Sequence, residues 1–346
     1  MQHIHSILAI GALTLLAASC SRDTAPEAVL SGNPEPVRLV VAVEGAGATK
    51  TTGVTSNDST TEAKVNNLQV FVFNGENLDG YGSIDNSRTI TVSCTAGRRE
   101  IYAVVNAPSL TGVTSRSQLL GTVSGLAAEI SNFQMSGSVT ETLPQDKTIT
   151  IPVDRLAARV VVKAVKNGLT AQALQALDFR LLSICLTNVA GDVDLGHSEN
   201  YAVSKWYNRR GYQQANSLGN FNYDAVNERI SSGGTYSTAH YFYSMPNRFD
   251  EASGGPWTPR RAKLVLKVQI GEAIYDYPIL LPVLESNKSY EIELVTLTRP
   301  GNKDNGREPD ADDDTDEEDI ISAKDISFEI SVNPWTVVTV TEGTTI

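Results

Sequence analysis

Most of the chain alternates short apolar runs with turn-forming residues, which is the pattern of an all-β protein. Runs rich in Val, Ile, Leu, Phe and Tyr are typical of strands, and the Gly, Pro, Asn and Asp between them are typical of turns. The spacing is that of an antiparallel sandwich. The predicted strands are Val37–Val43, Leu68–Phe73, Arg88–Cys94, Glu100–Asn106, Lys147–Val153, Phe179–Leu186, Tyr236–Tyr243, Ala262–Ile270, Ile274–Leu281, Ser289–Leu297, Asp325–Val332 and Trp335–Thr341.

Helical patterns are few and short. Ser115–Asn132 is the main candidate, with Ser115 as a possible N-cap and Leu126, Ile130 and Phe133 on one helical face. Leu169–Leu177 predicts one or two helical turns. In the run 155–165, helix propensity competes with the strand preference of three consecutive valines. The sequence therefore predicts an all-β protein with a few short helices.

The first strand is poorly connected to the strand that follows it. Its alternate residues Val37, Leu39, Val41 and Val43 share one face, as period-two alternation requires. The polar, turn-rich run 49–63 separates it from the next apolar segment.

The N-terminus has the features of a lipoprotein signal. The apolar run Ile7–Ala18 is too short for an ordinary membrane span, so we interpret residues 1–19 as a signal peptide. The sequence Ala-Ala-Ser-Cys places Ser19 and Cys20 at a predicted cleavage and lipidation point, although the expected leucine is one position too early. A plain secreted chain is the alternative. Residues 20–36 are polar and proline-bearing, and they predict a lipidated linker that tethers the protein to the outer membrane.

Composition argues against several functions. The chain has 346 residues and a net charge of −12, which makes binding to nucleic acid through charge improbable. It has four histidines and three cysteines, and we expect Cys94 and Cys185 to be small buried residues. His197 is interpreted as a surface loop residue, and His240 has no metal-ligand partner at a suitable spacing.

Motifs for enzymes and metal sites are absent from the sequence. No phosphate-binding glycine loop, dinucleotide loop or Gly-x-Ser-x-Gly motif occurs. The acidic run 299–319 lacks the spacing of a calcium-binding EF-hand loop and is interpreted as a solvated loop. We therefore expect no catalytic residues, no metal and no cofactor. The strand pattern divides near Pro152 into an N-terminal domain, 37–152, and a C-terminal domain, 153–346.

Several motifs occur together in a characteristic order. The segment VNNLQVFVFNGE, 65–76, is an apolar strand that ends in Phe-Asn-Gly, and VSCTAGRREIYAVVN, 92–106, contains a Cys-x-Ala-Gly-x-Arg turn before a strand that ends in Asn. VDRLAARVVV, 153–162, opens the second half, and NKSYEIEL, 287–294, precedes the closing strand with Trp335. In this order, the motifs resemble those of the fimbrillins, the major subunits of type V pili.

This resemblance implies the fold and the processing of the chain. It implies two tandem transthyretin-like β-sandwich domains, export as a lipoprotein, and cleavage by an arginine- or lysine-specific protease in the loop after the first strand. Lys50 lies where the family carries its cleavage-site arginine, so Thr51 is the expected mature N-terminus; Lys64 is the fallback. The first strand, 37–44, is then removed, and we expect it to be an edge strand.

The same resemblance implies a polymer. Removing a strand from a sandwich exposes unpaired backbone groups and an apolar trough, which a strand from a neighbouring copy can fill. We expect the donor to be the C-terminal strand, with Trp335, Val337, Val338, Val340 and Ile346 as its apolar residues. Such a head-to-tail contact does not close, so it builds a cell-surface filament that serves adhesion or biofilm formation.

Other roles remain open at this point. The chain could be an anchor subunit, which keeps its first strand, or a tip subunit of the same fimbria; tip, anchor and shaft subunits and the processing protease are the expected partners. A surface lipoprotein that binds glycans through Trp206, Tyr207 and Trp257 is a different class of function. Trp206, Tyr207 and Tyr212 could form a sugar-stacking patch, but we favour their partial burial in a loop-covered core.

Overall fold

The computed structural model describes residues 35–44, 62, 64–126, 132–209, 222–251, 257–303 and 326–335. The chain from Pro36 onward belongs to one compact unit. It is all-β with a few short helices, as the sequence predicts. Within these ranges, no helix is long and apolar enough to cross a membrane.

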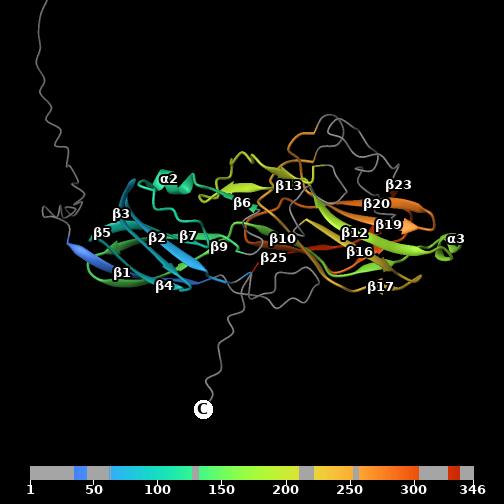
Figure 1. Ribbon diagram of the computed structural model, residues 1–346, viewed down its shortest axis with the longest axis horizontal. Helices are drawn as coiled ribbons and strands as arrows, with labels where there is room; N and C mark the ends of the chain where they lie inside the picture. Colours follow the sequence, from blue (N-terminus) through green and yellow to red (C-terminus); the bar gives the residue numbers. More distant parts are fainter. Residues whose placement is uncertain are drawn as a thin grey trace, which may run out of the picture. The chain divides into compact units, whose positions relative to one another are not determined.

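The first half of the chain forms two facing sheets (Figure 1). One has the order β4-β1-β8 and the other the order β3-β2-β5-β7-β9. Their bounds are β1 Pro36–Glu44, β2 Asn67–Asn74, β3 Asn77–Asp85, β4 Thr89–Thr95, β5 Gly97–Val105, β7 Met135–Leu143, β8 Lys147–Pro152 and β9 Asp154–Arg155. The inner faces of the two sheets share one hydrophobic core.

The predicted helix 115–132 is much shorter in the structure. Helix α2, Arg116–Leu120, begins at Ser115, whose hydroxyl and the side chain of Gln118 form a capping box. The helix ends after five residues because strand β6, Val123–Gly125, follows it and pairs with β14, Asp192–Asp194. Leu126 and Phe133 are buried in the hydrophobic core, and Ile130 lies outside the described residues.

The second half of the chain contains two successive four-stranded sheets made from the same four chain segments. Their orders are β18-β10-β21-β25 and β17-β11-β22-β24. The bounds are β18 His240–Ser244, β10 Ala158–Val162, β21 Lys288–Ile292, β25 Ile330–Pro334, β17 Thr235–Tyr236, β11 Val165–Asn167, β22 Val295–Leu297 and β24 Ile326–Ser327. Each of these four segments is therefore broken in the middle and contributes to both sheets, including the run 155–165 in which helix and strand preferences compete.

A five-stranded sheet of order β16-β12-β19-β20-β23 completes this half. Its hairpin crosses Gly271 and Glu272, as the sequence predicts. The bounds are β16 Tyr223–Arg229, β12 Phe179–Thr187, β19 Lys263–Ile270, β20 Ala273–Leu280 and β23 Asn302–Lys303; β13 Val189–Ala190 pairs with β15 Trp206–Tyr207, and helix α3 is Gln172–Gln175.

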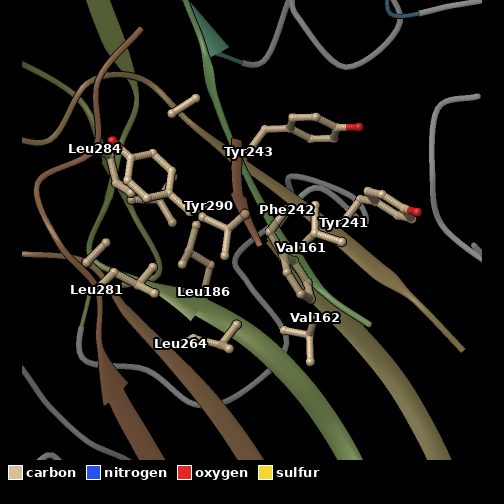
Figure 2. Close-up of a cluster of buried hydrophobic side chains, with 14 of the residues drawn as sticks. Val161, Val162, Leu186, Tyr241, Phe242, Tyr243, Leu264, Leu281, Leu284 and Tyr290 are labelled. Carbon is tan, nitrogen blue, oxygen red and sulfur yellow. The ribbon is translucent and has the colours of Figure 1, made fainter. Parts of the chain in front are cut away.

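The core of the second half lies between its sheets. Figure 2 shows Phe242 among the aliphatic side chains, whereas Tyr241 and Tyr243, its neighbours on strand β18, extend together away from Leu186 and Leu264. Strand alternation explains this division. All three aromatic residues are at most 2 % exposed, so both faces of β18 are covered.

Three of the longer strands were not predicted because they lack the apolar pattern of a strand. They are β3, β7 and β16. In β3, Gly80 and Gly82 allow close packing against β4: a Cβ atom at Gly80 would lie 2.5 Å from the Ser93 carbonyl oxygen, and one at Gly82 would lie 2.9 Å from a methyl group of Val92. The glycines that weaken the sequence signal are thus required by the packing.

Candidate functional site

Strand β1 is held on both sides. It pairs antiparallel with β4, from Pro36 opposite Thr95 to Ala42 opposite Thr89. It pairs parallel with β8, from Leu39 opposite Lys147 to Glu44 opposite Pro152. Figure 1 shows β1 in blue beside β4. The expectation of an edge strand is therefore wrong: β1 is the central strand of its sheet.

One face of β1 is embedded in the core. Val37, Leu39, Val41 and Val43 are 2 %, 0 %, 0 % and 5 % exposed. Apolar side chains of both neighbouring strands lie beside them: Val41, for example, is opposite Ile90 of β4 and Ile149 of β8. The inner face of the β2–β5 sheet covers them from the other side. The four predicted residues thus share one buried face.

Removing β1 would leave a slot with two open sides. The facing edges of β4 and β8 would both lose a complete ladder partner. Unpaired backbone N–H and C=O groups in an apolar environment are costly, so such a slot favours any extended segment that restores the ladders. The groove would also expose the apolar side chains that β1 now covers.

The Cys-x-Ala-Gly-x-Arg motif fixes the end of β4 that flanks this slot. Gly97 has a φ of +121°, a conformation that favours glycine. The turn lets Arg99 fold back, where its Nε donates to Asp79 Oδ2 at 2.7 Å. The Thr95 amide donates to the same carboxylate at 2.9 Å. Burial raises the pKa of Asp79, but the hydrogen bonds from Thr95 and Arg99 outweigh burial and leave this pKa below its ordinary value.

The asparagine that ends β5 fixes the chain entering β2. Asn106 is 2 % exposed and has a φ of +61°. Its Nδ2 donates to the carbonyl oxygens of Lys64, at 2.7 Å, and Phe133, at 2.9 Å. Its Oδ1 accepts the Asn66 amide at 2.8 Å. The backbone from Lys64 onward is therefore attached to the body of the protein.

Trp335 belongs to the chain's own core. Its side chain is 1 % exposed and packs against Phe133 with ring centroids 5.4 Å apart. It follows strand β25 directly, because Asn333 and Pro334 are part of this strand. Several predicted positions lie outside the described residues: Ser19, Cys20, Lys50, Thr51, Val337, Val338, Val340 and Ile346.

The aromatic residues considered for glycan stacking are largely engaged in packing. Trp206 is 9 % exposed, and its ring lies 5.2 Å from that of Phe249 and 5.3 Å from that of Trp257. The Trp257 indole N–H donates to Asn188 Oδ1 at 3.0 Å. Tyr207 is half-buried, and Tyr212 lies outside the described ranges.

The other candidate side chains are also engaged in packing and hydrogen bonds. His197 lies in a loop, as expected, but it is only partly exposed: its ring lies 2.7 Å from Ser136 Oγ and 3.3 Å from Ser286 Oγ, and burial lowers its pKa. His240 contacts Asp224 at 2.7 Å. Cys94 and Cys185 are buried free thiols, as expected. The described ranges contain no cluster of residues suited to bind a metal.

Comparison with known proteins identifies the family. Residues 37–166, which include β1, its two neighbouring strands and the two motifs described above, match the major fimbrial subunit protein family (FimA). The match supports a fimbrillin-family protein. The matched family is one of structural subunits of cell-surface fimbriae rather than of enzymes.

Solved structures show the same fold. A Bacteroides eggerthii protein described as a cell adhesion protein has a TM-score of 0.62 and 21% identity, over 88% of this chain and 99% of that chain. A fimbrilin from Porphyromonas gingivalis has a TM-score of 0.59 and 15% identity, over 88% and 98% of the two chains. The tip fimbrial protein Mfa3 of the same species has a TM-score of 0.52 and 14% identity, over 87% and 100%. A comparison with curated proteins finds no match.

Glu62 is the residue that the sequence analysis missed at this site. It is an acidic residue in a polar segment, but it is 0 % exposed and pairs with Arg159. A signal was nevertheless present in its partners. Arg155 and Arg159 interrupt an apolar run, and arginines in such a run need a buried partner.

Proposed function

We propose that this fimbrillin is a shaft subunit of a type V fimbria that polymerises by donor-strand exchange. It is exported as a lipoprotein through Cys20, cleaved after Lys50, and loses β1. The C-terminal segment of the next copy then enters the slot between β4 and β8. The observation that carries this proposal is the position of β1, whose four buried side chains and two ladders would all be vacated together.

The described residues favour Lys50 over Lys64 as the processing point. A protease requires several residues around the scissile bond in an extended, accessible form. The Lys64 carbonyl is hydrogen-bonded to Asn106, and Glu62, two residues before it, is fully buried. Cleavage at Lys64 would therefore require local unfolding.

The burial of Trp335 changes where the donor segment begins. Because this side chain is part of its own subunit's core, the segment available to a neighbour consists of residues 336–346. Val338 and Val340 are on one face of this segment if it is extended. Accessory tip and anchor subunits would terminate the polymer at its ends, and the assembled fimbria would serve adhesion or biofilm formation.

A peptide competition experiment tests the exchange. Processed subunits are mixed with a synthetic peptide of β1, PVRLVVAVE, or with a control peptide in which aspartate replaces the residues at Val37, Leu39, Val41 and Val43. We expect the β1 peptide to block polymer growth and the control to have no effect. Equal polymer growth with both peptides would contradict exchange at this slot, and an uncut subunit that keeps β1 in the fimbria would indicate an anchor.

A further inference from the structure

Three charged side chains are buried together behind strand β18. Glu62, Arg155 and Arg159 are 0 %, 0 % and 2 % exposed. Burial of a charge is costly unless the charge is paired and hydrogen-bonded. Together with Tyr243 and Trp335, these residues form what we call the Glu62 cluster.

Both oxygens of the Glu62 carboxylate accept hydrogen bonds. Its Oε2 accepts hydrogen bonds from Arg159 Nη1 at 3.0 Å and from the Trp335 indole N–H at 3.1 Å. Its Oε1 accepts the Tyr243 hydroxyl at 2.7 Å. The backbone carbonyl of Glu62 accepts Arg155 Nε at 3.1 Å. Both the side chain and the backbone of Glu62 are thereby attached to the second half of the chain.

Trp335 is held in the same cluster by its backbone and its ring. Its carbonyl oxygen accepts Arg155 Nη1 at 2.9 Å, and its amide donates to the Asn287 carbonyl at 2.9 Å. The guanidinium carbons of Arg155 and Arg159 lie 4.6 Å and 5.0 Å from the indole centroid, a cation–π arrangement. Arg155 therefore bridges the backbones of Glu62 and Trp335, which are far apart in the sequence. Burial lowers the pKa of Arg155 to about 10, so it stays charged at neutral pH.

Glu62 and Trp335, which Arg155 joins, each border a segment that takes part in the proposed exchange. Glu62 follows the segment 45–61 that contains Lys50, and Trp335 directly precedes the segment 336–346. In the proposed exchange, everything before the first segment leaves the subunit, and everything after Trp335 enters another subunit. Asn106 also binds the chain just after Glu62, through its hydrogen bonds with the backbone of Lys64 and Asn66.

We propose that the Glu62 cluster is the anchor of both exchanged ends. It keeps the new N-terminal segment attached to the folded subunit when β1 leaves. It also fixes Trp335, the residue from which the C-terminal segment starts, so that tension along the fibre is transmitted to the core at Trp335. This inference rests on the proposed function, but the anchor itself is a property of the single folded chain.

Hydrogen exchange of the full chain, measured by mass spectrometry, tests the anchor in the variant Trp335→Phe. Phenylalanine keeps an aromatic ring but loses the N–H that donates to Glu62. We expect amide exchange to accelerate roughly tenfold in both 64–67 and 330–334, because a hydrogen bond to a charged group contributes at least this factor. The matched control is Trp257→Phe, which loses an indole hydrogen bond to Asn188 and should leave both segments unchanged.

A second variant and a second measurement keep the two proposals separate. Glu62→Gln keeps the shape of the side chain but removes its charge, and it should also accelerate both segments; it replaces Trp335→Phe if that variant does not fold. Fimbriae of either variant should dissociate at a lower temperature than those of Trp257→Phe. Acceleration in one segment alone, in neither, or equally in the control would overturn the anchor. Absence of wild-type polymer would refute the proposed function and leave the exchange result to decide the anchor.

Discussion

The substitution Leu39→Ala separates the role of β1 in the precursor from its role in the fimbria. Leu39 is 0 % exposed at the centre of β1, opposite Val92 and Lys147. Its side chain fills the shared core of the two N-terminal sheets. According to the exchange account, this side chain is part of the precursor and is absent from the mature subunit.

The expected loss in the precursor is large. Replacing a fully buried leucine by alanine lowers the free energy of unfolding by about 2–5 kcal/mol, through lost transfer energy and the remaining cavity. For a unit of this size, each kcal/mol lowers the melting temperature by roughly 2–4 °C. The precursor should therefore melt at least several degrees lower, whereas processed subunits in the fimbria should be unchanged.

The control is Leu68→Ala in β2. Leu68 is also 0 % exposed in the same core, but it stays in the subunit after processing. Calorimetry of precursors and heat dissociation of fimbriae should show both variants destabilised as precursors and only Leu68→Ala destabilised in the fimbria. If Leu39→Ala weakened precursor and fimbria to the same extent, β1 would still be present in the polymer and the reasoning would be refuted.

Three further predictions follow from the same structure. Deletion of 336–346 should give a folded precursor with an unchanged melting temperature but no polymer by electron microscopy; a deletion that also removes Trp335 should melt lower, because that side chain is buried. Lys50→Ala should prevent maturation, which gel mobility of the surface-extracted protein reports, and normal processing of this variant would move the cut elsewhere. Burial, and secondarily Asp276, raises the pKa of the Cys185 thiol to about 12. Since an unfolded thiol ionises near pH 8.5, the stability that this group contributes is complete below that pH and declines as the pH rises toward 12, a decline in the free energy of unfolding that Cys185→Ala should lack.

The strands were predictable wherever their side chains face the core on alternate positions. The four buried residues of β1 and the hairpin of β19 and β20 are examples. Strand β3 was not predictable, because Gly80 and Gly82 replace the apolar residues that would have marked it and are needed for contact with β4. The breaks within the long strands of the second half, such as that between β21 and β22, depend on how two successive sheets form and leave no local signal.

The candidate site was partly predictable. Its buried face could be read from alternation, but the central position of β1 depends on parallel pairing with β8, which lies about one hundred residues later in the chain. Glu62 could not be found from its own segment, since a buried carboxylate is recognisable only once Arg159, Tyr243 and Trp335 surround it. Tertiary pairing, rather than local sequence, decides both features.

The exchange of β1 is tested most directly by the intact mass of subunits released from purified fimbriae. The account predicts a chain that begins at Thr51 and contains no residue of β1. Subunits that begin at a lipidated Cys20 and still carry Pro36–Glu44 throughout the shaft would contradict it.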